Sequence, residues 1–197
     1  KDAYEAFKSI GAFDRAASAA SQLNINLVRF SRGSDELLRD SVQYSEEGSS
    51  TKASILALLG LTEFLYNNVT DEAERLLDES IVLSTALDDK PVQAFALSAQ
   101  SEIRSRNLDL DGAREKAIRA LELSKQVGDG TSAASALYVL STIYWMDCDV
   151  KGIESLSSIL EDLQTNGIRL PDSYHSHAEA FLSWAQGDSI AINNMYA

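Results

Sequence analysis

Cysteine, proline and glycine are scarce in this chain of 197 residues. The single cysteine, Cys148, excludes an internal disulfide and is typical of a reducing compartment. Two prolines and ten glycines leave few points at which a helix must break. Long apolar runs are missing as well, since the longest, from Ile55 to Leu61, is far too short to cross a bilayer. We therefore expect a helical, cytoplasmic protein.

Positive charge is also in short supply. The chain has 17 Lys and Arg against 30 Asp and Glu, which gives a net charge of −13. Binding to nucleic acid phosphates or to an anionic membrane requires a basic surface. The composition therefore predicts that neither nucleic acid nor a membrane is a direct partner.

Residues that could carry chemistry are few and scattered. The sequence has no glycine-rich phosphate loop, no cysteine pair and no nucleophile elbow. His175 and His177 are its two histidines, and residues two apart on a helix point about 200° away from each other, so they cannot share a metal ion. We expect a protein that is not an enzyme, with no catalytic residue, metal site or cofactor.

The sequence does have a regular spacing of helix-start residues. Thr51, Pro91, Thr131 and Pro171 are evenly spaced, and their interval of about 40 residues falls within the range that marks a repeat architecture. Threonine is suited to an N-cap, because its hydroxyl can accept a hydrogen bond from a free amide, and proline is suited to the first helical position. We predict that each of these four residues marks the start of a helix.

Buried positions follow the same rhythm. One column of apolar residues recurs at almost the same interval on the predicted second helices: Leu38, Leu77, Ala117 and Leu156. Another recurs on the predicted first helices: Phe64, Ile103 and Ile143. Such columns are typical of helix pairs that stack face to face.

The columns allow the helices to be placed. First helices are predicted at 14–31, 51–67, 91–106, 131–146 and 171–186. Second helices are predicted at 35–47, 71–87, 110–127 and 150–165, with incomplete repeats at 2–10 and 189–197. The predicted fold is all-α: an α-solenoid of antiparallel helix pairs, in which residues 1–197 form a single helical-repeat array of about five pairs.

Several of these residues resemble the tetratricopeptide repeat family. The run from Ala113 through Ala117 to Leu121 is similar to the second helix of that family, and Leu59-Gly60 is similar to the Leu-Gly pair of its first helix. The repeat is longer than the family's typical unit of about 34 residues, so the resemblance is to long-repeat members. It implies a superhelix whose first helices line the binding surface. A HEAT-type array, with repeats of about 40 residues, is the alternative.

Charge is distributed unevenly between the two kinds of helix. Segments that hold the second helices, 34–48, 69–89, 109–129 and 149–169, sum to −13, whereas the first-helix segments 50–68, 90–108 and 130–148 sum to +1. If the family arrangement holds, the acidity forms an outer coat that aids solubility. The inner surface is then expected to be nearly neutral.

A candidate partner-binding set lies on the predicted first helices. Arg104, Tyr144 and Trp184 occupy equivalent positions in successive repeats, and Arg106 and Trp145 lie beside them. Arginine and aromatic residues are enriched at protein interfaces. The alternative is that the aromatic residues pack between repeats.

These features favour a protein–protein interaction scaffold that binds a protein or peptide segment on the first helices. The alternative is an effector-sensing or regulatory segment of a larger signalling or transcription-regulating protein, because the array begins and ends in mid-repeat. Repeat ends that expose apolar faces also favour a homodimer.

Overall fold

The computed structural model describes residues 2–23, 34–171, 174 and 183. Its regular elements within these residues are helical, and none of them is a strand, which confirms the predicted all-α class. The chain divides into two compact units, an N-terminal unit (Lys1–Ala99) and a C-terminal unit (Gln100–Ala197), and each is described by itself. The single array over residues 1–197 stays a prediction.

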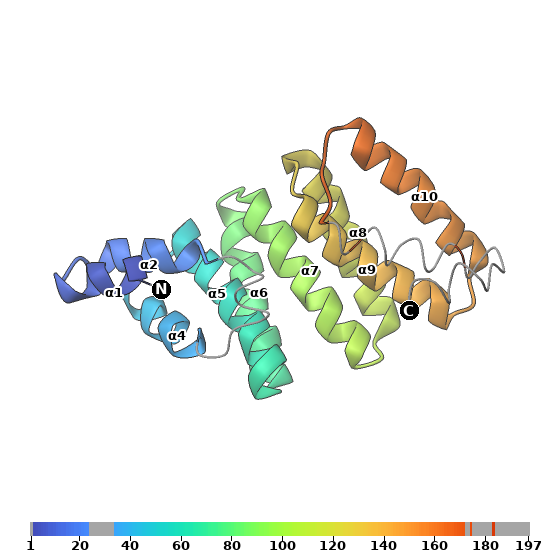
Figure 1. Ribbon diagram of the computed structural model, residues 1–197. Coiled ribbons are helices and arrows are strands. Elements are labelled where there is room, and N and C mark those ends of the chain that lie inside the picture. Colours follow the sequence, from blue (N-terminus) through green and yellow to red (C-terminus); the bar gives the residue numbers. More distant parts are fainter. Residues whose placement is uncertain (1, 24–33, 172–173, 175–182, 184–197) are drawn as a thin grey trace, which may run out of the picture. The chain divides into compact units, whose positions relative to one another are not determined.

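The N-terminal unit is built around α5. Its helices are α1 (Asp2–Ser9), α2 (Phe13–Ser21), α4 (Asp35–Tyr44), α5 (Ser50–Thr62), which continues into the π-helical turn η1 (Glu63–Asn67), and α6 (Thr70–Ala86). Helix α5 packs against α2, α4 and α6, and α2 also packs against α1 (Figure 1). Because α5 is apolar along most of its length, it is buried on several sides at once.

The C-terminal unit is centred on α9 in the same way. It contains α8 (Leu110–Val127), α9 (Gly130–Met146) and α10 (Val150–Thr165), and α9 packs against both α8 and α10 (Figure 1). Helix α7 (Lys90–Arg106) contains the boundary between the two units.

The predicted core columns are confirmed. Exposed fractions are at most 1 % along the second-helix column, Leu38, Leu77, Ala117 and Leu156, and Phe64, Ile103 and Ile143 are buried as well. The helices predicted from 51 to 165 agree with the structure to within a few residues. The helix predicted at 14–31 corresponds to α2, which ends at Ser21, and residues 24–33 lie outside the described residues. The predicted segments 171–186 and 189–197 fall largely or wholly outside them too.

The helices repeat at half the predicted period. Six consecutive helices begin at evenly spaced residues: Ser50, Thr70, Lys90, Leu110, Gly130 and Val150. Each helix and its turn thus form a module of about 20 residues, the short end of the range for structural repeats. The longer period seen in the sequence spans two such modules.

Every module boundary contains a residue with a left-handed backbone, and four of the six share one hydrogen-bonding pattern. The residue before the N-cap has a left-handed backbone, with φ between +53° and +73°, at Gly48, Asn68, Asp88, Leu108, Gly128 and Cys148. At four boundaries the next residue then donates its N–H to the carbonyl five residues back, as Asp89 does to Ser84 (2.8 Å) and Asp149 to Tyr144 (2.8 Å), whereas Ser49 donates to Glu46 (3.2 Å) and Val69 to Glu63 (3.4 Å). The pattern at the four boundaries is the Schellman arrangement, which satisfies carbonyls that a helix end leaves without partners.

At five of the six boundaries, the side chain of the residue after the left-handed position caps the next helix; Val69 is the exception. Asp129 Oδ1 accepts from the N–H groups of Thr131 (2.9 Å) and Ser132 (3.2 Å), and Ser49 Oγ accepts from the N–H of Lys52 (3.1 Å). Asp89, Asp109 and Asp149 accept from the first turn of their helices in the same way. The prediction that Thr51 and Thr131 are N-caps is therefore wrong: both lie in the first turn, two residues after the true cap.

One glycine sits where a neighbouring segment passes very close. A Cβ at Gly130, the first residue of α9, would lie 1.8 Å from the carbonyl oxygen of Arg169. Any side chain at this position would therefore displace the segment that follows α10.

The cap assignment predicts different outcomes for two neighbouring residues. Asp129→Ala should lower the free energy of unfolding by about 1 kcal/mol, because two N–H groups of α9 lose their acceptor. Thr131→Ala should change it by less than about 0.5 kcal/mol, because Thr131 is exposed and caps nothing. Urea denaturation followed by circular dichroism measures both, and the reverse order would contradict the assignment.

The left-handed turn predicts that a natural leucine is strained. Leu108 has φ +64° and is 70 % exposed, so it contributes little packing. Leu108→Gly should raise the free energy of unfolding by about 0.5–1 kcal/mol, because glycine adopts this conformation without the penalty of a Cβ. Leu108→Ala is the matched control: it removes the same exposed side chain but keeps the Cβ, and should not stabilise. Equal effects of the two changes would argue against strain.

Candidate functional site

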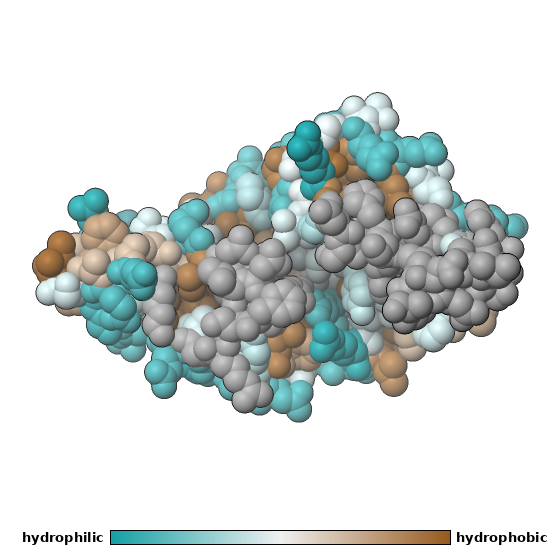
Figure 2. All heavy atoms as spheres, in the orientation of Figure 1, coloured by the Kyte–Doolittle hydropathy of each residue, from teal (hydrophilic) through white to brown (hydrophobic). Residues whose placement is uncertain are grey.

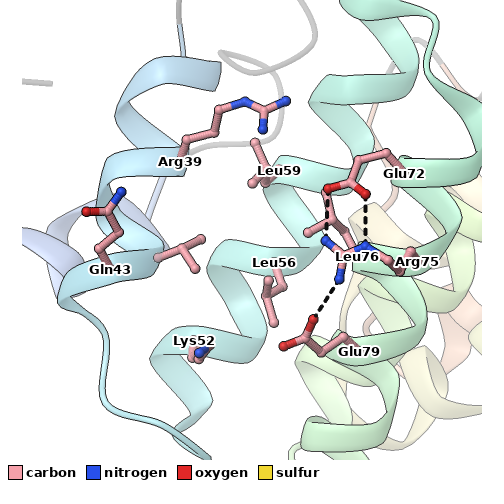
Figure 3. A pocket seen from close by; sticks show the side chains of 10 residues that line it. Arg39, Gln43, Lys52, Leu56, Leu59, Glu72, Arg75, Leu76 and Glu79 are labelled. Atoms are coloured by element: carbon pink, nitrogen blue, oxygen red, sulfur yellow. Dashed lines mark hydrogen bonds and ion pairs between the residues drawn. The ribbon is translucent and has the colours of Figure 1, made fainter.

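A cavity of about 440 Å³ opens in the N-terminal unit. Helix α4 lies on one side and α6 on the other, with Leu56 and Leu59 of α5 between them (Figure 3). Val42 of α4 and Leu76 of α6 add to this apolar surface. Charged side chains from all three helices surround it, so the cavity combines an apolar interior with a charged margin.

Arg75 holds the α6 side of the cavity together. Its Nε and Nη2 each donate to one carboxylate oxygen of Glu72, both at 2.8 Å, and its Nη1 donates to Glu79 (3.3 Å) (Figure 3). These hydrogen bonds are the main reason why the pKa of Glu72 lies below its usual value and that of Arg75 above it. Both oxygens of Glu72 are thus committed to Arg75.

Arg39 on α4 is oriented by a buried carboxylate. Its Nη2 forms an ion pair with Glu63, whose side chain is 1 % exposed, and the other oxygen of Glu63 accepts from Asn67 Nδ2 (2.9 Å). Glu63 and Asn67 are the two ends of the π-helical turn η1. Because an unpaired buried charge is costly, Glu63 fixes the guanidinium, which points over Leu59 (Figure 3).

A second cation lies lower in the cavity. The side chain of Lys52, in the first turn of α5, is 9 % exposed, and its ammonium pairs with Glu47. The side chain of Glu47 is 86 % exposed. The lining therefore includes a largely buried lysine side chain whose ion-pair partner is mostly exposed to solvent.

Helix α4 is tied to α1 at the residue after Arg39. The Tyr4 hydroxyl and the Lys8 ammonium both donate to Asp40 Oδ2. These hydrogen bonds lower the pKa of Asp40 below 3.8, while burial and the bond to Asp40 raise the pKa of Tyr4 from 10.0 to about 12. The hydrogen bond to Asp40 likewise raises the pKa of Lys8.

The two predicted partner-binding arginines lie in ion pairs of the C-terminal unit. Arg104 Nη1 is 3.2 Å from Asp109 Oδ2, and Arg106 Nη2 is 2.9 Å from Glu102 Oε1. A Cβ at Gly112 would come 2.7 Å from Arg104 Nη1, so Arg104 covers the start of α8. Arg104 is therefore engaged with its own helix pair.

Tyr144 occupies the equivalent place one repeat later. A Cβ at Gly152 would come 2.6 Å from its Cδ1, so its ring covers the start of α10. Tyr144, like Arg104, therefore packs within its own helix pair, and this contact does not test the alternative that the aromatic residues pack between repeats. Trp145 is 46 % exposed, and Trp184 lies outside the described residues. Partner binding by this set stays a prediction.

One feature of the sequence, separate from the repeat columns, indicates the position of the cavity. Lys52 and Glu63 are the only charged residues between 50 and 67, in a segment that is otherwise largely apolar. Charged residues in such a helix are buried with it and need partners. The structure supplies them as Glu47 and Arg39.

Metal-ligating residues do not gather in the described part of the chain, where no cluster of three or more His, Cys, Asp or Glu has a geometry that could hold a metal ion. His175 and His177 lie outside that part. Among the described helices, none has the length and apolar character needed to span a membrane.

No protein-family model, curated protein or solved structure matches this chain. The resemblance to tetratricopeptide repeats therefore stays a prediction from the residues quoted above.

The Asp40 cluster predicts how pH affects the docking of α1. Asp40 stabilises the fold above pH 3.8, and this contribution is lost as pH falls through its lowered pKa. Tyr4 must stay protonated in the fold, so stability also falls as pH rises from 10.0 toward 12. Hydrogen exchange of residues 2–9 should thus show steady protection near neutrality, after correction for intrinsic rates, and losses at both extremes.

Tyr4→Phe tests the same cluster. It should cost about 1–2 kcal/mol, because a hydrogen bond to a charged acceptor is lost, and it should weaken the alkaline loss. Ser9→Ala, an exposed change at the end of α1, is the control. Unchanged protection in Tyr4→Phe would show that the bond to Asp40 does not hold α1 in place.

Proposed function

We propose that this chain is a non-enzymatic protein–protein interaction scaffold, built as a tetratricopeptide-like α-solenoid of antiparallel helix pairs. The observation that supports this best is the succession of six helices that begin at evenly spaced residues, each with a left-handed residue just before its N-cap. Short turns bring the next helix back beside the one before it, and regular repetition of such pairs makes an extended surface.

The partner surface in this proposal is the one lined by the first helices. On α9, Tyr138 and Trp145 are 43 % and 46 % exposed. They are two helical turns apart, which places them on the same side of the helix. On the face drawn in Figure 2, apolar residues reach the surface of the described part in several small areas set among hydrophilic ones. Aromatic anchors within a polar surround are typical of protein interfaces.

A second candidate function is effector sensing within a larger regulator. The cavity between α4 and α6 favours it, because about 440 Å³ lies within the usual range for small-molecule sites. The two functions use different surfaces and are separable by mutation.

The scaffold proposal predicts that partner capture depends on exposed residues of the first helices. Affinity capture with mass spectrometry, using the full-length protein as bait, identifies the partner. The double variant Trp145→Ala, Arg106→Ala should then bind it at least tenfold more weakly, as expected when an interface anchor is lost, with unchanged helicity. Val82→Ala, on the second helix α6 and 67 % exposed, is the matched control. Undiminished capture by the double variant would reject this surface.

A further inference from the structure

The lining of the cavity in the N-terminal unit has one more cationic than anionic side chain, in a strongly acidic chain. Its lining includes three cationic side chains, Arg39, Lys52 and Arg75, and two carboxylates, Glu72 and Glu79. The chain as a whole has a net charge of −13. Two of the cations also pair with carboxylates outside the lining, Arg39 with Glu63 and Lys52 with Glu47. A guanidinium with further donors beside an apolar interior indicates a ligand with an anionic end and an apolar body.

We propose that this cavity binds a small organic acid, an apolar chain that ends in a single carboxylate. The inference rests on the second candidate function, effector sensing, and is independent of the scaffold surface. The apolar part of the ligand lies against Val42, Leu56, Leu59 and Leu76, and its carboxylate binds Arg39.

Arg39 is the anchor because it is held in place and still has donors. Of its guanidinium nitrogens, Nη2 alone is engaged by a residue of the described part of the chain, and that partner is the buried Glu63. A guanidinium has five N–H donors in a planar fork that matches a carboxylate. Glu72 does not compete for them, since both of its oxygens bind Arg75.

Lys52 favours a negatively charged ligand over a positively charged one. Its side chain is 9 % exposed, and the side chain of its partner Glu47 is 86 % exposed. A carboxylate in the cavity gains attraction from the Lys52 ammonium, and an amine is repelled by it. Glu79 on the opposite side is already hydrogen-bonded to Arg75.

The test compares three probes that share one apolar chain. Isothermal titration calorimetry of the full chain should show binding of octanoate, at least tenfold weaker binding of 1-octanol, and no binding of octylamine at neutral pH. The difference between acid and alcohol measures the charge-assisted hydrogen bonds to Arg39. Equal affinity for octanoate and 1-octanol would overturn the anchor.

Two variants locate the site. Arg39→Lys keeps a cation beside Glu63 but offers no second arm to the ligand, so octanoate should bind about tenfold more weakly. Gln43→Trp places a large side chain at an exposed position on the lining and should abolish binding. The control is Arg119→Lys, an exposed arginine of α8 that pairs with Glu122, where affinity should be unchanged. The urea midpoint of each variant shows that it is folded.

Three results would overturn the proposal: no heat of binding with millimolar octanoate, undiminished binding by Gln43→Trp, or equal loss in Arg119→Lys. A neutral compound that stabilises the wild type but not Gln43→Trp in a thermal-shift screen, without any effect of octanoate, would reject the carboxylate and leave effector sensing standing.

Discussion

At the four boundaries from Asp89 to Asp149, the bond from the residue after the left-handed position to the carbonyl five residues back determines most of the architecture. It ends one helix, and the side chain of the same residue, as at Asp89, Asp109, Asp129 and Asp149, caps the next. Two helix ends are therefore satisfied within a very short stretch of chain. Because these four turns have the same form, helices α6 to α10 have nearly the same length, 16 to 18 residues, and their buried positions return at a constant interval. The core columns follow from the turn as much as from hydrophobicity.

The helices were predictable from the sequence because apolar side chains at Leu38, Leu77, Ala117 and Leu156 mark one buried face at a constant spacing. The caps were not predictable, because threonine and proline also suit helix starts, and the aspartates that form the caps are equally compatible with ordinary surface charge. The positions with a left-handed backbone were only partly predictable from the sequence. Gly128 is typical of such a position, whereas Leu108 and Cys148 adopt the conformation because the turn requires it. At these two residues the tertiary structure overrides local preference.

In the candidate site, too, some features can be predicted from the sequence and others depend on how the helices pack. Two charges in an apolar helix, Lys52 and Glu63, indicate that partners are needed, and the sequence contains that fact. Which residues serve as partners depends on how α4 packs on α5, and no local pattern encodes that packing. Arg39 lies on one of the predicted second helices, and the acidic charge of these helices indicated only an outer surface that aids solubility. Conversely, Arg104 and Tyr144 share a column, and the structure shows each of them covering a glycine at the start of the next helix. Residues at equivalent positions in successive repeats can share a packing role at least as readily as they share a binding role.

The close passage at Gly130 has an evolutionary consequence. Since the carbonyl of Arg169 occupies the space where a Cβ would stand, selection can accept no other residue at position 130 without moving the segment after α10. Thr131, one residue on and exposed, is under no such restriction. Divergent descendants of this chain should therefore keep glycine at the first of these two positions while the second drifts. That pattern would mark the start of α9 in an alignment even where the apolar columns had changed beyond recognition.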